Sequence, residues 1–507
     1  MREDQKGEDM KRKHWTMIVP GAVLLCASPA FAVDLREAVQ AALNTNPEIR
    51  QAVHNKIATR EERKQAQGRW LPTISVEGSA GIRSLRNPTR RAIGIADERL
   101  EPIEGQVIAD QLLFDFGERT AEIRRQASRT DAAGARIEER SEFVALNVSR
   151  AYIDYLLQQR LVAIAQDNAT FHERLAGDLR EGVARGSISV ADQQQAEERL
   201  QSARARVTEA REDLDTAAIQ FQTLTGVPID AVNMPPDLSG AMPPTLQDAE
   251  TLARDNNPRV QEAIYDLATQ REVIKTSQSQ LGPRFNAEAT ARYGNDIDGF
   301  KGHTSDLGAR VVMRWKVFDG LANTANVREQ KARADEAHAR LFQMQRQAEE
   351  DVRTAWSRLT NQSRLASELE TQSRVADDLL LSYREQFNVG RRSLLDVLDA
   401  QNTRQNVQAQ AETARMAKLY AQYRVLAASN RLLEALGVSM PSEGWNNESE
   451  RFHVNRVPVS DRQENSMPYP VMGPPASASD MAPAPAPAPE PAPEPMPEPA
   501  PEPTTGQ

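Results

Sequence analysis

The sequence contains one unit twice, and this duplication limits what the chain can fold into. Asn46-Pro47 and Pro72 recur 211 residues later as Asn257-Pro258 and Pro283. Further along, Phe114-Asp115, Gly186 and Asp192 recur 204 residues later as Phe318-Asp319, Gly390 and Asp396. A repeat of this length is a duplicated domain rather than a short-repeat solenoid. We predict a first unit over residues 33–240 and a second over 241–444, with one loop between Pro72 and Phe114 longer in the first.

Each unit contains two segments in which polar and apolar residues alternate. The apolar positions in residues 284–294 are Phe285, Ala287, Ala289, Ala291 and Tyr293, and those in 306–318 run on odd numbers from Leu307 to Val317. A period of two with one charged face predicts strands that have water on one side and lipid or core on the other. The first unit has equivalent segments at about 72–83 and 105–115, the latter weakened by Gln111 on its apolar face.

These segments have the length of transmembrane strands, about ten residues. Four strands cannot close a barrel, and lipid offers no partner to an open sheet edge. Several copies would therefore have to share one barrel. The alternation alone leaves a second interpretation equally open, in which two soluble hairpins pack against helices.

Long helices follow each strand pair. Residues 118–185 contain no proline, and 322–388 match them in the second unit. Apolar residues of the returning segment follow a 3.5-residue repeat that specifies a left-handed supercoil: Ala196, Leu200, Ala203, Val207, Ala210, Leu214, Ala217, Phe221 and Leu224. The second unit repeats this pattern, but Arg404 and Lys418 interrupt it. With 39% apolar and 26% charged residues, the composition favours elongated solvated helices over compact cores.

The two ends of the chain differ in composition from the repeated units. Residues 1–32 resemble a signal peptide, with a basic segment after Met10, an apolar stretch and an Ala30-Phe31-Ala32 cleavage site. Met10 is an alternative start. Cys26, the single cysteine, lies inside this peptide and follows Leu25 rather than the small residue that a lipoprotein signal needs. Residues 445–507 form a proline-rich tail, which we predict to be disordered because its composition cannot build a core.

The turns between the long helices carry glycine and acidic residues. Gly186 and Gly390 can end a helix with positive φ, and Ser189 to Asp192 and Ser393 to Asp396 match helix-capping boxes. Capping explains Asp192 and Asp396 without any further role. Asp399 lies past the first turn, on the same face as Asp396, so capping does not explain it.

The paired Phe-Asp motifs and the sequence VGRRSLLDVLDAQ at residues 389–401 resemble the TolC family of outer-membrane channel proteins, in particular its type I secretion branch. The resemblance covers about residues 33–438. It implies a mainly α protein with a membrane β-barrel portion: a homotrimer in which four strands per chain form one 12-stranded barrel in the outer membrane, and long helices continue as a coiled-coil tunnel into the periplasm.

The same resemblance assigns roles to residues of the turns. Asp396 and Asp399 match the carboxylates that constrict the periplasmic entrance, Asp192 and Arg392 match a charge link that holds it closed, and Gly186 and Gly390 match the turns that contact an adaptor protein. A tyrosine usual in the charge link is replaced by Phe387, so its hydroxyl hydrogen bond is missing.

No catalytic or cofactor motif competes with a transport role. The six histidines are scattered, and neither a P-loop nor an H-E-x-x-H motif occurs. The 62 basic and 72 acidic residues give no basic excess for nucleic acid. We therefore expect a passive, non-enzymatic duct without cofactors that takes its energy from a partner. The resemblance implies that this partner is an inner-membrane ABC transporter, which acts through a periplasmic adaptor. The alternatives are an efflux duct that serves a proton-driven drug or metal pump, and a soluble periplasmic coiled-coil scaffold.

Overall fold

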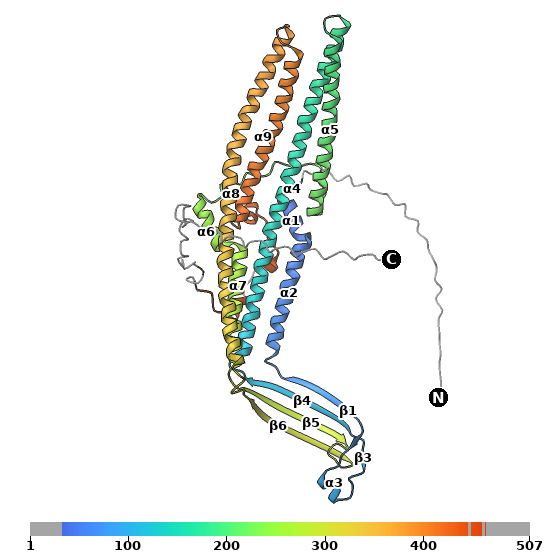
Figure 1. Cartoon of the computed structure of the whole chain (residues 1–507), viewed down its shortest axis with the longest axis vertical. Helices are drawn as coiled ribbons and strands as arrows, with labels where there is room; N and C mark the ends of the chain where they lie inside the picture. The colour runs from blue at the N-terminus through green and yellow to red at the C-terminus, as the bar shows by residue number, and fades with distance from the viewer. Residues whose placement is uncertain (1–32, 445–447, 459–461, 463–507) are drawn as a thin grey trace, which may run out of the picture. The chain divides into compact units, whose positions relative to one another are not determined.

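The computed structural model describes residues 33–444, 448–458 and 462, so the predicted signal peptide lies outside the described residues. The first unit comprises α1 (Leu35–Thr45), α2 (Pro47–Gly68), β1 (Thr73–Ala80), β4 (Ile103–Phe114), α4 (Glu118–Ala184) and α5 (Val190–Thr225). The second comprises α6 (Leu246–Asn256), α7 (Pro258–Ser279), β5 (Arg284–Asn295), β6 (His303–Arg314), α8 (Ala322–Asn388) and α9 (Leu394–Ala428). The predicted mainly α class, with a duplicated helix, strand, strand, helix, helix unit, is confirmed (Figure 1).

The four long strands form one antiparallel sheet in the order β1-β4-β5-β6. The register places Val76, Val107, Ala291 and Leu307 side by side on one face. That face is apolar and open to the surroundings, with Val76 78% and Leu307 83% exposed. The opposite face is polar, where Gln106 donates to Glu77 at 2.6 Å, and Arg310 and Arg314 both pair with Glu288.

Two strand boundaries differ from the sequence-based prediction. β6 covers His303–Arg314 rather than 306–318, and β1 ends at Ala80 rather than near residue 83. The residues after β1 form a small insertion made of β2 (Arg83–Ser84), α3 (Pro88–Ala92) and β3 (Arg99–Leu100). This insertion accounts for the longer loop of the first unit. The buried Arg90 stabilises it by donating hydrogen bonds to the carbonyls of Ile95 and Glu98, and to that of Gly299 in the loop between β5 and β6.

The repeated Phe-Asp motif begins each long helix. Asp115 Oδ2 accepts the backbone N–H of Arg119 at 3.0 Å, and Asp319 Oδ2 accepts that of Asn323 at 3.0 Å. The aspartate thus satisfies an N–H group that the first helical turn leaves unpaired. Two residues with positive φ intervene in each copy, Phe116-Gly117 and Gly320-Leu321, and they turn the chain sharply from strand to helix.

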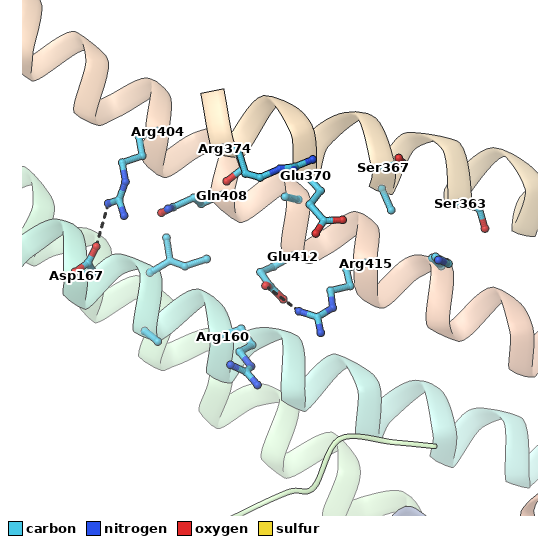
Figure 2. Close-up of a pocket in the computed structure, with 16 residues that line it drawn as sticks. Arg160, Asp167, Ser363, Ser367, Glu370, Arg374, Arg404, Gln408, Glu412 and Arg415 are labelled. Atoms are coloured by element: carbon cyan, nitrogen blue, oxygen red, sulfur yellow. Dashed lines mark hydrogen bonds and ion pairs between the residues drawn. The ribbon is translucent and has the colours of Figure 1, made fainter. Parts of the chain in front are cut away.

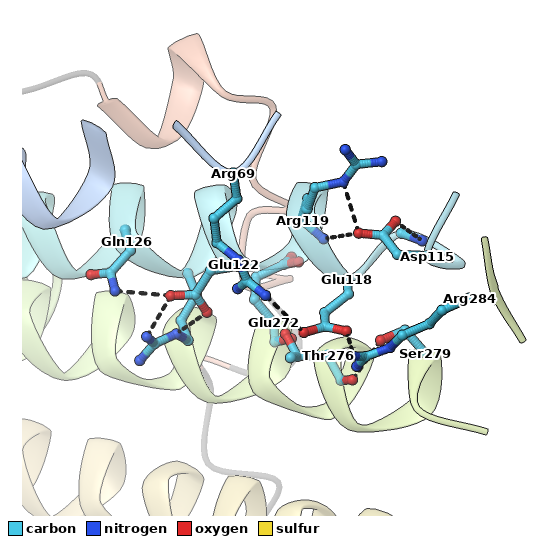
Figure 3. Close-up of polar contacts among 12 residues, drawn as sticks. Arg69, Asp115, Glu118, Arg119, Glu122, Gln126, Glu272, Thr276, Ser279 and Arg284 are labelled. Carbon is cyan, nitrogen blue, oxygen red and sulfur yellow. Dashed lines mark hydrogen bonds and ion pairs between the residues drawn. The ribbon is translucent and has the colours of Figure 1, made fainter. Parts of the chain in front are cut away.

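Glu118 links the two units where the strands meet the helices (Figure 3). It pairs with Arg69 at 3.3 Å, just after α2, and with Arg284 at the start of β5. Beside it, the guanidinium of Arg119 lies 4.1 Å from the centre of the Trp70 ring. The side chain of Glu118 is only 10% exposed, so the pair with Arg284 joins the first unit to the second in a partly desolvated setting, where ion pairs are stronger than at the surface.

The main apolar core joins the middle of α4 to the ends of the other helices. It contains α1, the segment Val144–Leu156 of α4, the end of α5, the end of α9 and the short helix α10 (Leu432–Leu436). Tyr152 and Tyr423 fix the linker between the units, because their hydroxyls donate to the carbonyls of Asn233 and Pro236. Glu142 of α4 accepts the N–H of Leu433 at 3.2 Å, and burial raises the pKa of this carboxyl to about 8.

The paired helices α4 with α5 and α8 with α9 extend away from this core (Figure 1). α4 and α8 are each 67 residues long, or about 100 Å at 1.5 Å per residue. Seam residues such as Leu200, Ala203 and Phe221 are buried, as the 3.5-residue repeat predicts. None of the described helices combines the length and apolarity required to cross a membrane.

Residues 448–457 of the predicted disordered tail are ordered, which corrects the extent of that tail. α11 (Glu448–Arg451) begins on Asp131 of α4, whose carboxylate accepts the N–H groups of Glu448 and Ser449 at 3.2 and 2.7 Å. Phe452 stacks on Arg63 at 4.5 Å. Val457 is 2% exposed in a cluster with α6, α7 and α8. This strap, residues 448–457, therefore fastens the first unit to the second, while the proline-rich remainder lies outside the described residues.

We predict that a chain ending at Gly444 is less stable than a chain ending at Pro458. The shorter chain loses the burial of Val457 and leaves Asp131 without its two N–H donors, a cost of about 3 kcal/mol. Thermal unfolding followed by circular dichroism should show a lower midpoint for the shorter chain. The longer truncation keeps the whole strap and serves as the control; equal midpoints would show that the strap contributes nothing.

Candidate functional site

Two helical turns at the far ends of the hairpins hold the residues singled out in the sequence. Gly186 and Gly390 have φ values of +73° and +72°. After each glycine the chain folds back onto the preceding helix, because the N–H of Ser187 donates to Gly182 O at 3.0 Å and that of Arg391 to Gln386 O at 2.8 Å. These bonds satisfy the last carbonyls of α4 and α8. Both glycines are exposed at the surface, where a partner can reach them.

Asp192 and Asp396 cap the helices that follow the turns. The Ser189 hydroxyl donates to Asp192 at 2.7 Å and the Ser393 hydroxyl to Asp396 at 2.8 Å. The backbone N–H of Ser393 completes a capping box with Asp396. The Ser393 hydroxyl lowers the pKa of Asp396, and Arg392 acts in the same direction. Within one chain, Asp396 is therefore held as a carboxylate, and the predicted capping box is confirmed for Ser393 and Asp396. In the first unit the Ser189 hydroxyl accepts the N–H of Asp192 at 3.1 Å, which is the serine half of the capping box.

Asp399 differs from the two capping aspartates. It lies one turn beyond Asp396 on α9 and is exposed, whereas its neighbours Leu398 and Ala400 are buried. Among the described residues, none donates a hydrogen bond to its side chain in the structure. Its carboxylate is thus available to water and ions, and the capping geometry gives no reason for its presence.

Arg392 contacts its own hairpin. Its guanidinium lies 4.0 Å from the centre of the Tyr383 ring, 3.8 Å from Asp396 and 3.2 Å from Gln386 Oε1. Within the described part of a single chain, it forms no ion pair with Asp192. Phe387, which stands where the family usually has tyrosine, packs into the apolar clusters of the tip. Tyr383, one helical turn earlier, stacks on Arg392 instead.

The two turns differ in chemistry although their backbones match. In the first unit, Ile188 packs on Gly182, where a Cβ atom would lie 2.6 Å from the Ile188 side chain. The equivalent residues of the second unit are Arg392 and Gln386, which form a hydrogen bond. Ile188 closes the first turn by apolar packing, whereas the equivalent Arg392 closes the second by polar contacts and lies beside Asp396.

Polar side chains join the two hairpins several turns away from the tips. Arg404 of α9 pairs with Asp377 of α8 and, at 3.1 Å, with Asp167 of α4. One turn closer to the tip, the buried Gln401 donates to the buried Asn168 at 2.8 Å. Arg404 lies at the rim of a groove of about 820 Å³ between α4, α8 and α9, in which Glu412 pairs with Arg415 within α9 (Figure 2).

Sequence reasoning did not assign a role to Arg404. The signal was present, because Arg404 interrupts the heptad pattern at the position equivalent to Leu200 of the first unit. Leu200 is buried in an apolar cluster with α4 and α9, whereas Arg404 binds carboxylates on two other helices. The interruption of the pattern therefore marks a contact between hairpins. No group of three or more acidic, His or Cys side chains in the described ranges could hold a metal ion.

The chain matches the family described as outer membrane efflux protein over residues 38–227 and 251–438, which correspond to the two units. It is 21% identical to the alkaline protease secretion protein AprF of Pseudomonas aeruginosa over 77% of this chain and 83% of AprF. It is 25% identical to the outer membrane efflux protein BepC of Brucella suis biovar 1, over 65% of this chain and 70% of BepC. Its fold is similar to the CmeC outer membrane channel of Campylobacter jejuni, with a TM-score of 0.68, 14% identity, and coverage of 85% of this chain and 89% of CmeC.

We predict that Arg404→Met loosens the contact between the hairpins near the tip. Loss of the pairs with Asp167 and Asp377 should cost about 1–2 kcal/mol locally, or roughly 5–30-fold faster amide exchange in residues 394–408. Arg415→Met is the matched control, since Arg415 lines the same groove but pairs only with Glu412 of its own helix. Equal exchange in the two variants would show that Arg404 does not join the hairpins.

Proposed function

The chain belongs to the outer membrane efflux protein family, and we propose that it is the exit duct of a type I protein secretion system. In this proposal three copies form the duct. An inner-membrane ABC transporter supplies the energy through a periplasmic adaptor, and the duct itself performs no chemical reaction and carries no cofactor. The protein resides in the outer membrane, as its family does, with the helices directed into the periplasm.

The two faces of the sheet support a conducting barrel. The apolar face, with residues such as Ile74, Val76, Leu307 and Val311 exposed, suits contact with lipid. The opposite face carries Glu77, Glu288, Arg310 and Arg314, which suits a water-filled interior. A sheet with these two faces gains from membrane insertion only if the polar face is enclosed, and this observation carries the proposal.

The tips of the hairpins form the periplasmic entrance in this proposal. Asp399, free of capping contacts, and Asp396 from each copy would surround the opening and attract cations. Arg392 would reach Asp192 on a hairpin of the adjacent copy and help to hold the entrance closed. The exposed turns at Gly186 and Gly390 would contact the adaptor.

The assignment to secretion rather than efflux rests on the turn sequence at residues 389–401 and on the similarity to AprF, whose name describes alkaline protease secretion. The similarity to BepC, named as an efflux protein, supports the alternative, an efflux duct for drugs or metals. A soluble periplasmic scaffold, the other alternative, does not fit the family or the exposed apolar face of the sheet.

We predict that a strain without this protein loses specific proteins from its culture medium and retains them inside the cell. The expected cause is that cargo of the ABC transporter has no exit across the outer membrane. Mass spectrometry of medium and cells would measure this, with the wild-type gene restored as control. An unchanged set of secreted proteins together with greater sensitivity to drugs or metals would contradict secretion and favour the efflux alternative.

We predict that replacing both Asp396 and Asp399 by Asn weakens cation selectivity and reduces block by divalent cations in single-channel recordings. The change keeps side-chain size and removes the charge that attracts cations. Arg392→Ser should instead raise conductance through the closed entrance, because it removes the proposed link to Asp192 and leaves the carboxylates in place. Wild-type selectivity and block in the double variant would restrict both aspartates to helix capping and the surface.

A further inference from the structure

The sheet of one chain has two edge strands, β1 and β6. The N–H and C=O groups on the outer edges of these two strands need hydrogen-bond partners, which lipid cannot supply. If several copies share one barrel, as proposed above, β6 of one copy must lie beside β1 of the next. The residues that meet at this boundary are not fixed by the number of copies, because strands can pair in several registers.

The duplication supplies a template for this boundary. β4 is the second strand of the first unit and β5 is the first strand of the second unit, so their pairing already joins two successive units within the chain. At the boundary between copies, β6 is likewise the second strand of its unit and β1 the first strand of its unit. The hairpins have equivalent registers, because Thr73 pairs with Asp110 in the first, and the residues at the equivalent positions, Arg284 and Arg314, pair in the second.

The second strands end differently in the two units. β4 continues beyond Asp110, its last partner on β1, and Gln111, Leu112 and Phe114 pair only with β5, while a bulge skips Leu113. β6 ends at Arg314, its last partner on β5. Trp315 to Val317 continue the alternating pattern of β6, and Val317 and Phe318 are 75% and 80% exposed. Trp315, Lys316 and Phe318 are equivalent to the residues of β4 that pair with the neighbouring unit.

The pairing of β4 with β5 can therefore be transferred to the boundary between copies. Asp110 faces Glu288 within the chain, and the equivalent residues at the boundary are Arg314 and Glu77. In the same register Lys316 faces Ser75 on the polar face and Trp315 faces Val76 on the apolar face. Val312, an apolar residue on the polar face, faces Ser79. The like-charged pair of the template becomes a pair of opposite charges.

We infer that β6 of one copy extends to Phe318 and pairs with β1 of the next copy in this register, with Arg314 and Glu77 forming an ion pair on the polar face. A shift by one residue would turn Glu77 to the lipid side. A shift by two residues would place Glu77 opposite Val312 or Lys316. In the inferred register, Arg314 contacts Glu288 of its own chain and Glu77 of the neighbour, and closes the polar face across the boundary.

Cysteine pairs can measure the register directly. We expect Ser79→Cys with Val312→Cys to form a disulfide between chains after mild oxidation, because directly opposite residues have Cβ atoms about 5 Å apart. Ser79→Cys with Arg310→Cys is the control shifted by two residues, at about 7–8 Å, which is too far for a disulfide. Electrophoresis in SDS without reductant separates linked chains from single chains.

The outcomes distinguish this inference from the proposed function. A link in the shifted pair but not in the first pair would overturn the register while leaving a shared barrel. An intact oligomer without either link would also overturn the register. A protein that is monomeric in mild detergent, without any link, would instead contradict the shared barrel on which the inference rests.

Charge reversal tests the ion pair. Glu77→Arg and Arg314→Glu should each lower the temperature at which the oligomer dissociates in SDS, and the double variant should recover stability relative to both single variants. Arg314→Glu also removes the contact of Arg314 with Glu288. This loss occurs in both the single and the double variant, so it cancels when the effect of the double variant is compared with the sum of the two single effects. If the double variant shows only the sum of the two single effects, Glu77 and Arg314 do not meet.

Discussion

The requirement that every backbone N–H and C=O group in lipid has a partner governs the arrangement of this protein. One chain supplies a four-stranded sheet with an apolar outer face, which is enough for a segment of a barrel but not for a closed one. Three residues separate the end of β4 from the start of α4 and seven separate the end of β6 from the start of α8, and the Phe-Asp motif, Phe114-Asp115 or Phe318-Asp319, lies at each connection. A closed ring of strands therefore imposes a ring of helices, and the tunnel wall follows from the pairing of the strands.

The duplication repeats the backbone, but the chemistry at the two hairpin tips has diverged. Positions equivalent to Arg392, Asp399 and Arg404 of the second unit hold Ile188, Gln195 and Leu200 in the first. At these three positions the first hairpin has uncharged residues and the second has charged ones. If the tips form the entrance proposed above, this division lets the hairpins of the first unit support the wall while those of the second present ionisable groups to the opening.

Sequence periodicity predicted which elements exist because the pattern depends on which face of each element is wet. The heptads around Leu200 reflect burial between helices, whereas the alternation in residues 284–294 separates a polar face from an apolar face that is exposed in the single chain, and the structure confirms both patterns. The ends of the strands and the contacts between residues distant in the sequence could not be predicted from periodicity. The end of β6 depends on pairing with a strand that the chain itself does not supply. The strap depends on Asp131, more than 300 residues away in the sequence, and its short, mixed composition carries no periodic signal.

The distribution of contacts along the hairpins also bears on movement. At the base, the large apolar core and the strap join both units through many buried side chains. Near the tips, the hairpins share small apolar clusters and a few polar links, with Arg404 and the Asn168–Gln401 pair among them.

Local opening is easiest where few buried apolar contacts must separate. Water can replace Asp167 and Asp377 as partners of Arg404 at modest cost, because these carboxylates are 64% and 44% exposed. The Asn168–Gln401 pair is buried, but it is a single hydrogen bond. The tips can therefore separate while the base and the sheet remain intact, so that an entrance at the tips can open without disturbing the part of the molecule that lies in the membrane.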